Sequence, residues 1–332
     1  MRQVAGSRAT IRKALTIAAT VVAVAIPPIL AVALGQSRLA GSLVLPVMAT
    51  LLPALLAGPR TALFATGIVT AGSAGAALTS GDPILAGAVM GLTSLVAALG
   101  CRWGQSKILV LVPMTVGFLV CVTPSVSSDR GTNALVIGGA TLAAALWGTA
   151  VGTFLHRDAP HGAPKVESWQ RTWAYAIVLA ILTGIAAGVS VAIDWAHAGG
   201  WFILTVVLVF QPYLQDSFQR TWQRAGGTIL GVIAAYAIHV VLPWPSVEVV
   251  IGAVLMVASI MVISEQKYPY WFFTTLLTPA IVLLSGSSAN FSEVAAARLL
   301  ATFAGAALAF TAAALLAPLY SAGAKKRGLT RY

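Results

Sequence analysis

The residues best suited to binding a ligand lie near the start of a hydrophobic segment in the second half of the chain. Arg224 is followed by Ala-Gly-Gly-Thr228, so a cation stands beside some of the smallest residues in the sequence. If a helix begins here, its unpaired amide groups carry partial positive charge and Arg224 adds a full charge. Helix amino termini bind anions readily, so Arg224, Gly226, Gly227 and Thr228 form a candidate carboxylate site. The alternative is that Arg224 only anchors a helix at the cytosolic membrane surface.

A second arginine and a group of polar and proline residues stand among apolar residues of the same half. Arg298 lies near the start of the last hydrophobic segment, where a cation is costly: about 2.5–3.5 kcal/mol at a helix centre and less near its end. It either faces a substrate path or extends to the outer membrane surface. The other candidates line a polar path or satisfy the backbone that proline leaves unpaired; they are Gln211, Pro212, Thr275, Thr278 and Pro279.

The sequence offers no constellation for catalysis or metal binding. None of the four histidines has ligand spacing with another histidine, a cysteine or a carboxylate, and no phosphate-binding loop of the P-loop type is present. The nine acidic residues lie at or beyond the ends of the hydrophobic segments, so no carboxylate proton relay within the membrane is evident. We therefore expect no enzyme, no cofactor and no metal.

The composition is that of a polytopic membrane protein. Hydrophobic residues make up 58% of the 332 residues and charged residues only 9%, against about 25% in soluble domains. Mean hydropathy is +0.90. A bilayer core needs roughly 20 helical residues per span, and polar, glycine and proline residues divide the chain into twelve candidate spans. These are 12–34, 40–57, 61–79, 83–99, 107–123, 134–155, 172–194, 199–214, 225–242, 246–263, 270–285 and 294–317.

The basic residues indicate orientation rather than nucleic-acid binding. With both termini in the cytosol, only Arg38, Arg130 and Arg298 fall at the outer side, and the other 17 of the 20 lysines and arginines fall inside. This asymmetry follows the positive-inside rule. The sequence thus predicts a multi-pass protein of the plasma (inner) membrane whose partner is the lipid bilayer.

The two halves correspond weakly but in order. Arg60 opens the third span as Arg224 opens the ninth, and Pro113 interrupts the fifth span as Pro279 interrupts the eleventh. Six spans in each half would enter the membrane in the same direction, which defines a parallel repeat. We therefore predict an all-α fold with a first six-helix repeat (1–155), a cytosolic linker (156–171), a second six-helix repeat (172–320) and a basic cytosolic tail (321–332).

The second half resembles the fusaric acid resistance family of membrane proteins, also called the aromatic acid exporter group. That family shows a tryptophan, an apolar stretch, a proline and then an arginine before Gly-Thr-x-x-Gly. The matching residues are Trp201, Gln211-Pro212, Arg224-Ala-Gly-Gly-Thr228, Gly231, Ala297-Arg298-Leu299-Leu300 and Gly305. The resemblance covers about residues 172–317. The first half matches only in its pattern of spans, with Arg60-Thr-Ala-Leu-Phe64 in place of the arginine–glycine–threonine element.

The resemblance implies export of organic anions, including aromatic carboxylates, from the cytosol. The membrane potential would assist the export, since moving one negative charge outward across 100 mV is favourable by about 2.3 kcal/mol. The alternatives are a non-transporting scaffold or envelope assembly factor, and an anion channel. Many family members carry a large cytosolic domain or work with periplasmic partners, and neither is evident here. A homo-oligomer remains open.

Overall fold

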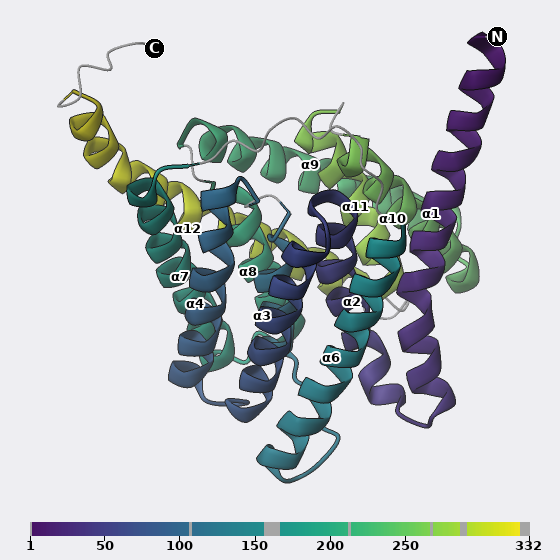
Figure 1. Cartoon of the computed structure of the whole chain (residues 1–332), viewed down its shortest axis with the longest axis horizontal. Coiled ribbons are helices and arrows are strands. Elements are labelled where there is room, and N and C mark those ends of the chain that lie inside the picture. Colours follow the sequence, from purple (N-terminus) through teal and green to yellow (C-terminus); the bar gives the residue numbers. More distant parts are fainter. Residues whose placement is uncertain are drawn as a thin grey trace. The chain divides into compact units, whose positions relative to one another are not determined.

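The computed structural model describes residues 2–105, 108–155, 167–211, 214–265, 268–285 and 291–325. In this part of the chain the regular structure is entirely helical, with twelve α-helices and one short 3-10 helix (Figure 1). Each of the twelve predicted spans coincides with one α-helix. The all-α fold and the helix count are therefore confirmed, while the linker at 156–166 and the end of the tail lie outside the described residues.

The chain divides into two compact units, Met1–Ala196 and His197–Tyr332. The first unit holds α1 (Arg2–Ala33), α2 (Ser37–Ala57), α3 (Pro59–Leu78), α4 (Pro83–Leu99), η1 (Gly100–Trp103), α5 (Leu111–Cys121), α6 (Arg130–Leu155) and α7 (Trp169–Ala192). The second holds α8 (Ala196–Val209), α9 (Leu214–Val241), α10 (Pro245–Glu265), α11 (Tyr270–Ser285) and α12 (Phe291–Lys325). Because α7 packs on α4 in the first unit, the division into units differs from the predicted repeat, which stays a prediction.

Seven of the described helices are long and apolar enough to cross a membrane. They lie at Ser37–Ala57, Pro59–Leu78, Pro83–Trp103, Arg130–Leu155, Trp169–Ala192, Ser217–Val241 and Phe291–Leu315. Helix α5 has 11 residues, and α8 and α11 have 14 and 16. At about 1.5 Å per residue these three helices reach only about 16–24 Å, less than the bilayer core of about 30 Å. The prediction of twelve complete spans therefore goes further than the helix lengths support.

Glycines allow the helices of the first unit to pack closely. A Cβ on Gly87 of α4 would lie 2.9 Å from the carbonyl oxygen of Gly184 of α7, and a Cβ on Gly184 would lie 2.9 Å from that of Gly87. Between α2 and α6, a Cβ on Gly148 would lie 2.5 Å from the carbonyl oxygen of Val47, and one on Gly152 would lie 2.6 Å from that of Leu51. Small residues spaced four apart have this effect in membrane helices, where close van der Waals packing drives association.

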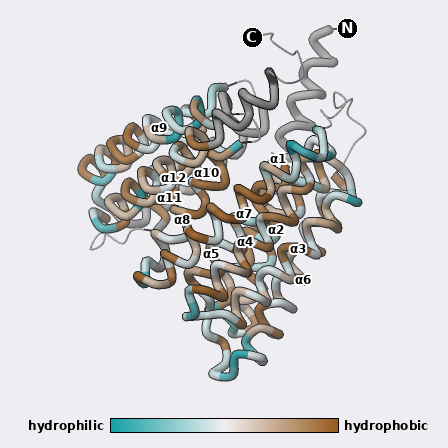
Figure 2. Tube along the Cα trace, turned by 90° about the vertical axis from the view of Figure 1, so that its left-hand side faces the viewer, coloured by the Kyte–Doolittle hydropathy of each residue, from teal (hydrophilic) through white to brown (hydrophobic). Residues whose placement is uncertain are grey.

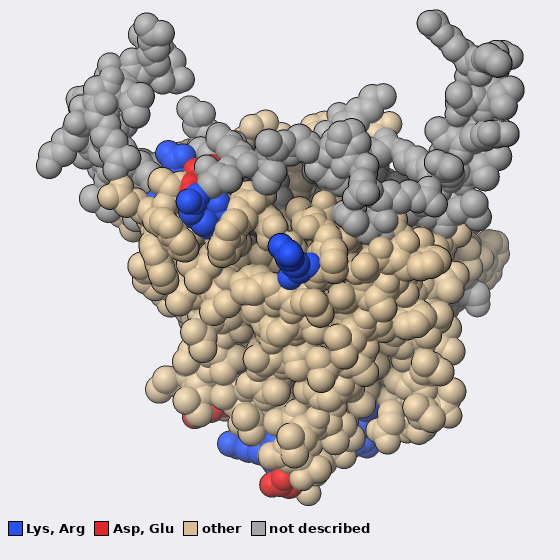
Figure 3. Space-filling view, viewed as in Figure 1, with Lys and Arg blue, Asp and Glu red and all other residues tan. Residues whose placement is uncertain are grey.

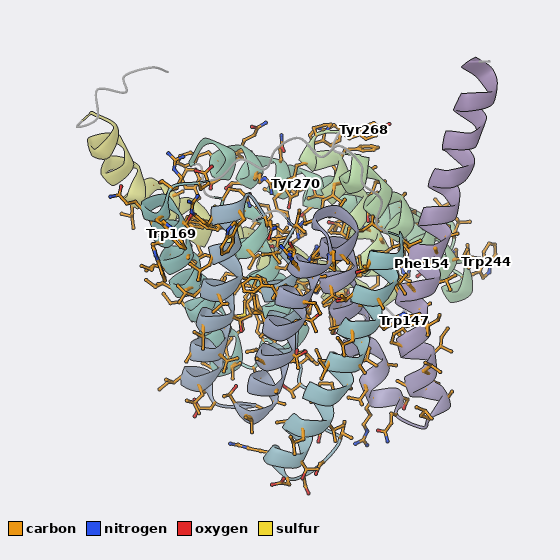
Figure 4. The ribbon with its side chains drawn as sticks, in the orientation of Figure 1. Trp147, Phe154, Trp169, Trp244, Tyr268 and Tyr270 are labelled. Atoms are coloured by element: carbon orange, nitrogen blue, oxygen red, sulfur yellow. The ribbon has the colours of Figure 1, made fainter. Side chains whose placement is uncertain are left out.

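Hydroxyl groups add hydrogen bonds across the same helix pairs. Thr50 of α2 donates to the carbonyl oxygen of Ala145 of α6 at 2.8 Å, and Thr183 of α7 donates to Ser94 of α4 at 2.8 Å. The indole of Trp147 on α6 donates to the carbonyl oxygen of Ala23 on α1 at 2.9 Å (Figure 4). These bonds fix the register of helices whose outward side chains are apolar.

The outer surface of these helices is apolar, as lipid contact requires. Leu63, Ile84, Leu92, Leu135 and Phe154 are all more than half exposed. Brown, hydrophobic stretches run along most of the helices in Figure 2. Over α3, α4 and α6 in Figure 3, charged side chains lie near helix ends and the surface between them is uncharged. The distribution is typical of a membrane-embedded helix bundle.

Gly148→Ala should destabilise the protein by about 1–3 kcal/mol, because the added Cβ overlaps backbone and side-chain atoms of α2. Thermal unfolding in detergent would measure the change. Gly139→Ala on the same helix is the matched control, since no atom lies within 4 Å of its Cβ position. That control should be neutral or slightly stabilising, because alanine favours helix. Equal effects of the two substitutions would argue against the close α2–α6 packing.

Candidate functional site

Helices α9 and α12 of the second unit run antiparallel and contact each other at both ends. The rings of Phe218 and Phe310 lie 5.0 Å apart at one end, and those of His239 and Phe291 lie 4.3 Å apart at the other. Helix α11 packs on the other side of α9, where Gly227 and Gly231 meet it. The two ring contacts define which residues of α9 lie opposite which residues of α12.

Arg224 and Arg298 come together in the interior of this arrangement. Arg224 lies six residues beyond Phe218, and Arg298 lies twelve residues before Phe310. Their positions therefore differ by six residues, about 9 Å along the axis, a distance that two arginine side chains cover. Both residues have no exposed surface, and the two charges interact electrostatically. Two cations that enter from opposite ends of antiparallel helices thus meet inside the protein.

Aromatic rings surround the two guanidinium groups. Arg298 lies over the ring of Trp201 on α8, with its central carbon 4.1 Å from the ring centroid. Arg224 donates from Nη1 to the hydroxyl oxygen of Tyr270 at 3.4 Å, and Arg220 lies 5.2 Å over the same ring. Figure 4 labels Tyr270 at the start of α11. We call Trp201, Arg220, Arg224, Tyr270 and Arg298 the arginine–aromatic cluster.

Among the residues that the structure describes, most hydrogen-bonding groups of the two buried arginines have no partner. Nε and Nη2 of Arg224 and all three nitrogens of Arg298 are buried and unpaired. The hydroxyls of Thr228, Thr278 and Thr302 are also buried and unpaired, each one turn beyond a cluster residue or Thr274 on its own helix. A buried donor without a partner costs about 1–3 kcal/mol, and more when it is charged. The interior therefore holds a set of donors that an incoming acceptor would satisfy.

No carboxylate whose side chain the structure describes neutralises this charge. The ion pairs among those side chains are Arg171–Glu167 at 3.0 Å and His239–Glu248 at 2.9 Å, and neither involves the cluster. Stacking on an aromatic ring stabilises a cation by about 2 kcal/mol when it is desolvated. It leaves the edge of the guanidinium free. The cluster thus presents planar, bidentate donors of the kind that bind carboxylate or sulfonate groups.

The structure corrects two expectations about the arginines. Helix α9 begins at Leu214, so Arg224, Gly226, Gly227 and Thr228 lie inside a continuous helix and offer no free helix amino terminus. Near Arg224 the residues of α9 change from mostly polar to mostly apolar, and from the sequence alone this change indicates the start of a helix. Arg298 does not extend to the outer membrane surface, because it is fully buried against Trp201.

The other predicted site residues take separate places. Gln211 is buried at the end of α8, where its amide donates to the carbonyl oxygens of Leu208 and Phe210, so it supports the connection to α9. Thr275 donates within α11 to Trp271. Pro279 and Thr278 pack against Gly231, and Thr274 lies where a Cβ on Gly227 would stand. Pro212 lies outside the described residues.

Sequence reasoning missed Tyr270 and did not connect Trp201 with Arg298. The signal for Tyr270 was its place in the first turn of the segment whose threonines and proline were already candidates. The pairing of Trp201 with Arg298 joins residues 97 positions apart, and no local pattern indicates it. In the described part of the chain no group of three or more histidine, cysteine or acidic side chains could hold a metal ion.

Comparisons with known proteins place the cluster in a family segment. Residues 174–312 match the fusaric acid resistance protein-like family, which confirms the resemblance over the second half and includes every cluster residue. An uncharacterized protein of Neisseria gonorrhoeae is 28% identical over 158 residues, 47% of this chain and 36% of the relative. One of Haemophilus influenzae is 33% identical over 126 residues, 37% of this chain and 17% of the relative.

The chain therefore spans about a third or less of the curated relatives that it matches. No solved structure matches it. The family match and the long apolar helices together indicate a multi-pass membrane protein.

Arg298→Met should raise the melting temperature in anion-free detergent. The substitution removes a buried cation that costs about 2.5–3.5 kcal/mol and forfeits about 2 kcal/mol of stacking on Trp201, so we expect a net gain of roughly 1 kcal/mol. Arg60→Met is the control, because Arg60 is exposed at the start of α3 and should give no gain. A lower melting temperature for Arg298→Met would mean that the folded chain already neutralises Arg298.

Proposed function

We propose that the protein is a transporter of organic anions in which Arg224 and Arg298 receive the anionic group. The observation that carries this proposal is the pair of fully buried arginines with five unpaired guanidinium nitrogens. No carboxylate among the side chains that the structure describes pairs with these nitrogens. A site that must bind and release an anion has to keep these donors free.

The aromatic residues of the cluster support an aromatic acid as the substrate. Trp201 and Tyr270 border the guanidinium groups, and Phe273 lies 5.8 Å from Tyr270 between ring centroids. Ring pairs at such distances contribute about 0.5–1.5 kcal/mol beyond area burial. A planar acid would set its carboxylate on the arginines and its ring among these side chains. The match to the fusaric acid resistance protein-like family agrees with this substrate class.

Hydroxyl groups one helical turn after each arginine add further hydrogen-bond donors. Thr228 follows Arg224 on α9, and Thr302 follows Arg298 on α12. Both hydroxyls are buried and unpaired. They would donate hydrogen bonds to the anion as it leaves the arginines. We infer that Arg224, Thr228, Arg298 and Thr302 lie along the path of the anion.

The membrane potential supplies a driving force for export. The proposal keeps both termini in the cytosol, and the excess of basic residues on that side supports this orientation. One negative charge that leaves across about 100 mV gains roughly 2.3 kcal/mol, which supports a gradient of about fiftyfold. The proposed direction is therefore outward across the plasma (inner) membrane.

Arg224→Gln should lower anion flux by tenfold or more, since hydrogen bonds to a charged group contribute about 1.5–3 kcal/mol. The measurement is uptake of radiolabelled benzenesulfonate into proteoliposomes under a potassium–valinomycin potential. Benzenesulfonate stays ionised, so it does not cross the lipid as a neutral acid.

Arg60→Gln is the matched control, because Arg60 holds the corresponding place in the first half but is exposed. It should transport at the wild-type rate. Gel filtration and thermal unfolding must show that both variants are folded. Absence of flux for wild type across sulfonates and carboxylates would overturn the proposal and favour a scaffold. Flux that never saturates would indicate a channel.

A further inference from the structure

A histidine and a glutamate form a buried pair at the opposite end of α9 from Arg220. Nδ1 of His239, in the last turn of α9, lies 2.9 Å from Oε1 of Glu248, in the first turn of α10. The side chain of Glu248 is 3% exposed and that of His239 is 23% exposed. The sequence spacing of nine residues concealed this contact, which forms across the turn at Leu242–Trp244 between the end of α9 and the start of α10.

An apolar wall surrounds the pair. The ring of Phe291 on α12 stacks on the imidazole with an interplanar angle of 7°. Phe291 belongs to a core cluster with Ala235, Val282, Leu283 and Ala295, against which Ile238 and Ile251 also pack. A lone charge in such surroundings carries a large desolvation cost. The net charge of the pair therefore governs whether this end of the bundle stays closed.

Helix ends favour the charged forms of both partners. The negative end of the α9 dipole stabilises a protonated His239, and the positive end of the α10 dipole stabilises an ionised Glu248. With one proton the pair is neutral as a whole, either as an ion pair or as two uncharged groups. Without that proton it holds a net negative charge against the apolar wall. Binding of one proton from the adjoining water, with no other reactant, restores neutrality.

Few other ionisable groups face the pair from the elements around it. Helix α9 adds Tyr236, which is 61% exposed and tilted against Phe291. Helix α12 adds Glu293, which is exposed. Helix α10 has no other ionisable residue before Glu265, and α11 has none between Phe272 and Ser285. The charged partner nearest to each member of the pair is therefore the other member.

Helix α9 carries both His239 and Arg224, and α12 carries both Arg298 and Phe291, which stacks on His239. Fifteen residues of α9, about 22 Å, separate His239 from Arg224, and seven residues of α12 separate Phe291 from Arg298. An opening of the α9–α10 end changes the packing of the same two helices that hold the arginines. A proton bound at one end is thereby linked to anion binding in the interior.

We propose that His239 and Glu248 form a proton-binding site whose occupancy controls anion transport. This inference rests on the proposed transport function. When the pair holds the proton and is neutral, the end of α9 stays packed against the start of α10. When the pair has lost the proton and is negative, water enters and the two helix ends separate. On the predicted topology this end lies at the outer side of the membrane.

The first test reads the proton site without transport. In wild-type protein labelled with 15N-histidine, the His239 ring signals, assigned by their loss in His239→Gln, should change when the pH is changed, because the ring and the carboxylate share one proton. In Glu248→Gln the ring signals should respond to pH differently, because the imidazole has lost its carboxylate partner. Glu293→Gln, an exposed carboxylate two residues from Phe291, is the control and should leave the signals unchanged. Identical titrations in wild type and Glu248→Gln would overturn the proton site.

The second test reads transport. Benzenesulfonate flux into proteoliposomes is measured at a fixed potassium–valinomycin potential while the pH is changed on one side at a time. Wild type and Glu293→Gln should change flux about fivefold or more for one side only, the lower end of usual coupling between sites. The double variant His239→Gln/Glu248→Gln, in which the pair has no group left to bind the proton, should transport at a rate independent of pH. Retained pH dependence in this double variant would refute the inference, whereas absence of flux in every protein would refute the transport function instead.

Discussion

The second unit depends on one electrostatic constraint: two arginines are buried close together without a counterion among the described side chains. Like charges in a medium of low dielectric repel strongly, so the surrounding structure must hold them in place. Trp201 and Tyr270 stabilise the faces of the guanidinium groups, while α9 and α11 approach closely through Gly227 and Gly231. The close packing of α9 against α11 helps to offset the cost of burying two like charges. The arrangement is understandable if the missing counterion is a ligand.

The histidine–glutamate pair differs from the two arginines because its members can carry opposite charges. His239 and Glu248 are matched to each other, to the dipoles of their helices and to a stacked ring, so their charges cancel when one proton is present. The arginines have no such internal balance. A chain with 9% charged residues thus holds two different buried charge sites, one formed by α9 and α10 and the other by α9 and α12. One of them is balanced by a proton and the other is open to an anion.

Apolar segments separated by polar, glycine and proline residues predicted the helices well, because a helix that crosses the lipid needs about 20 apolar residues. They could not predict how each helix begins. Polar residues 214–223 read as a loop before Arg224, yet they continue α9, since a helix that leaves the apolar region still satisfies its own backbone. From the sequence, Arg298 was recognised as a costly residue and Arg224 as a candidate for binding an anion. Their meeting was not predictable, because it depends on the antiparallel register of two helices about 70 residues apart in the sequence.

The packing of helix ends also explains why the sequence did not predict that Glu248 is buried. Glu248 does lie in the first turn of its helix, as expected of an interfacial carboxylate, but it is almost fully buried. Position along a helix therefore does not determine solvation when another helix end covers it. His239 closes α9 over the start of α10, and Phe291 closes α12 over His239. Three helix ends together bury a carboxylate that any one of them would leave exposed, and the neighbouring imidazole supplies its hydrogen-bond partner.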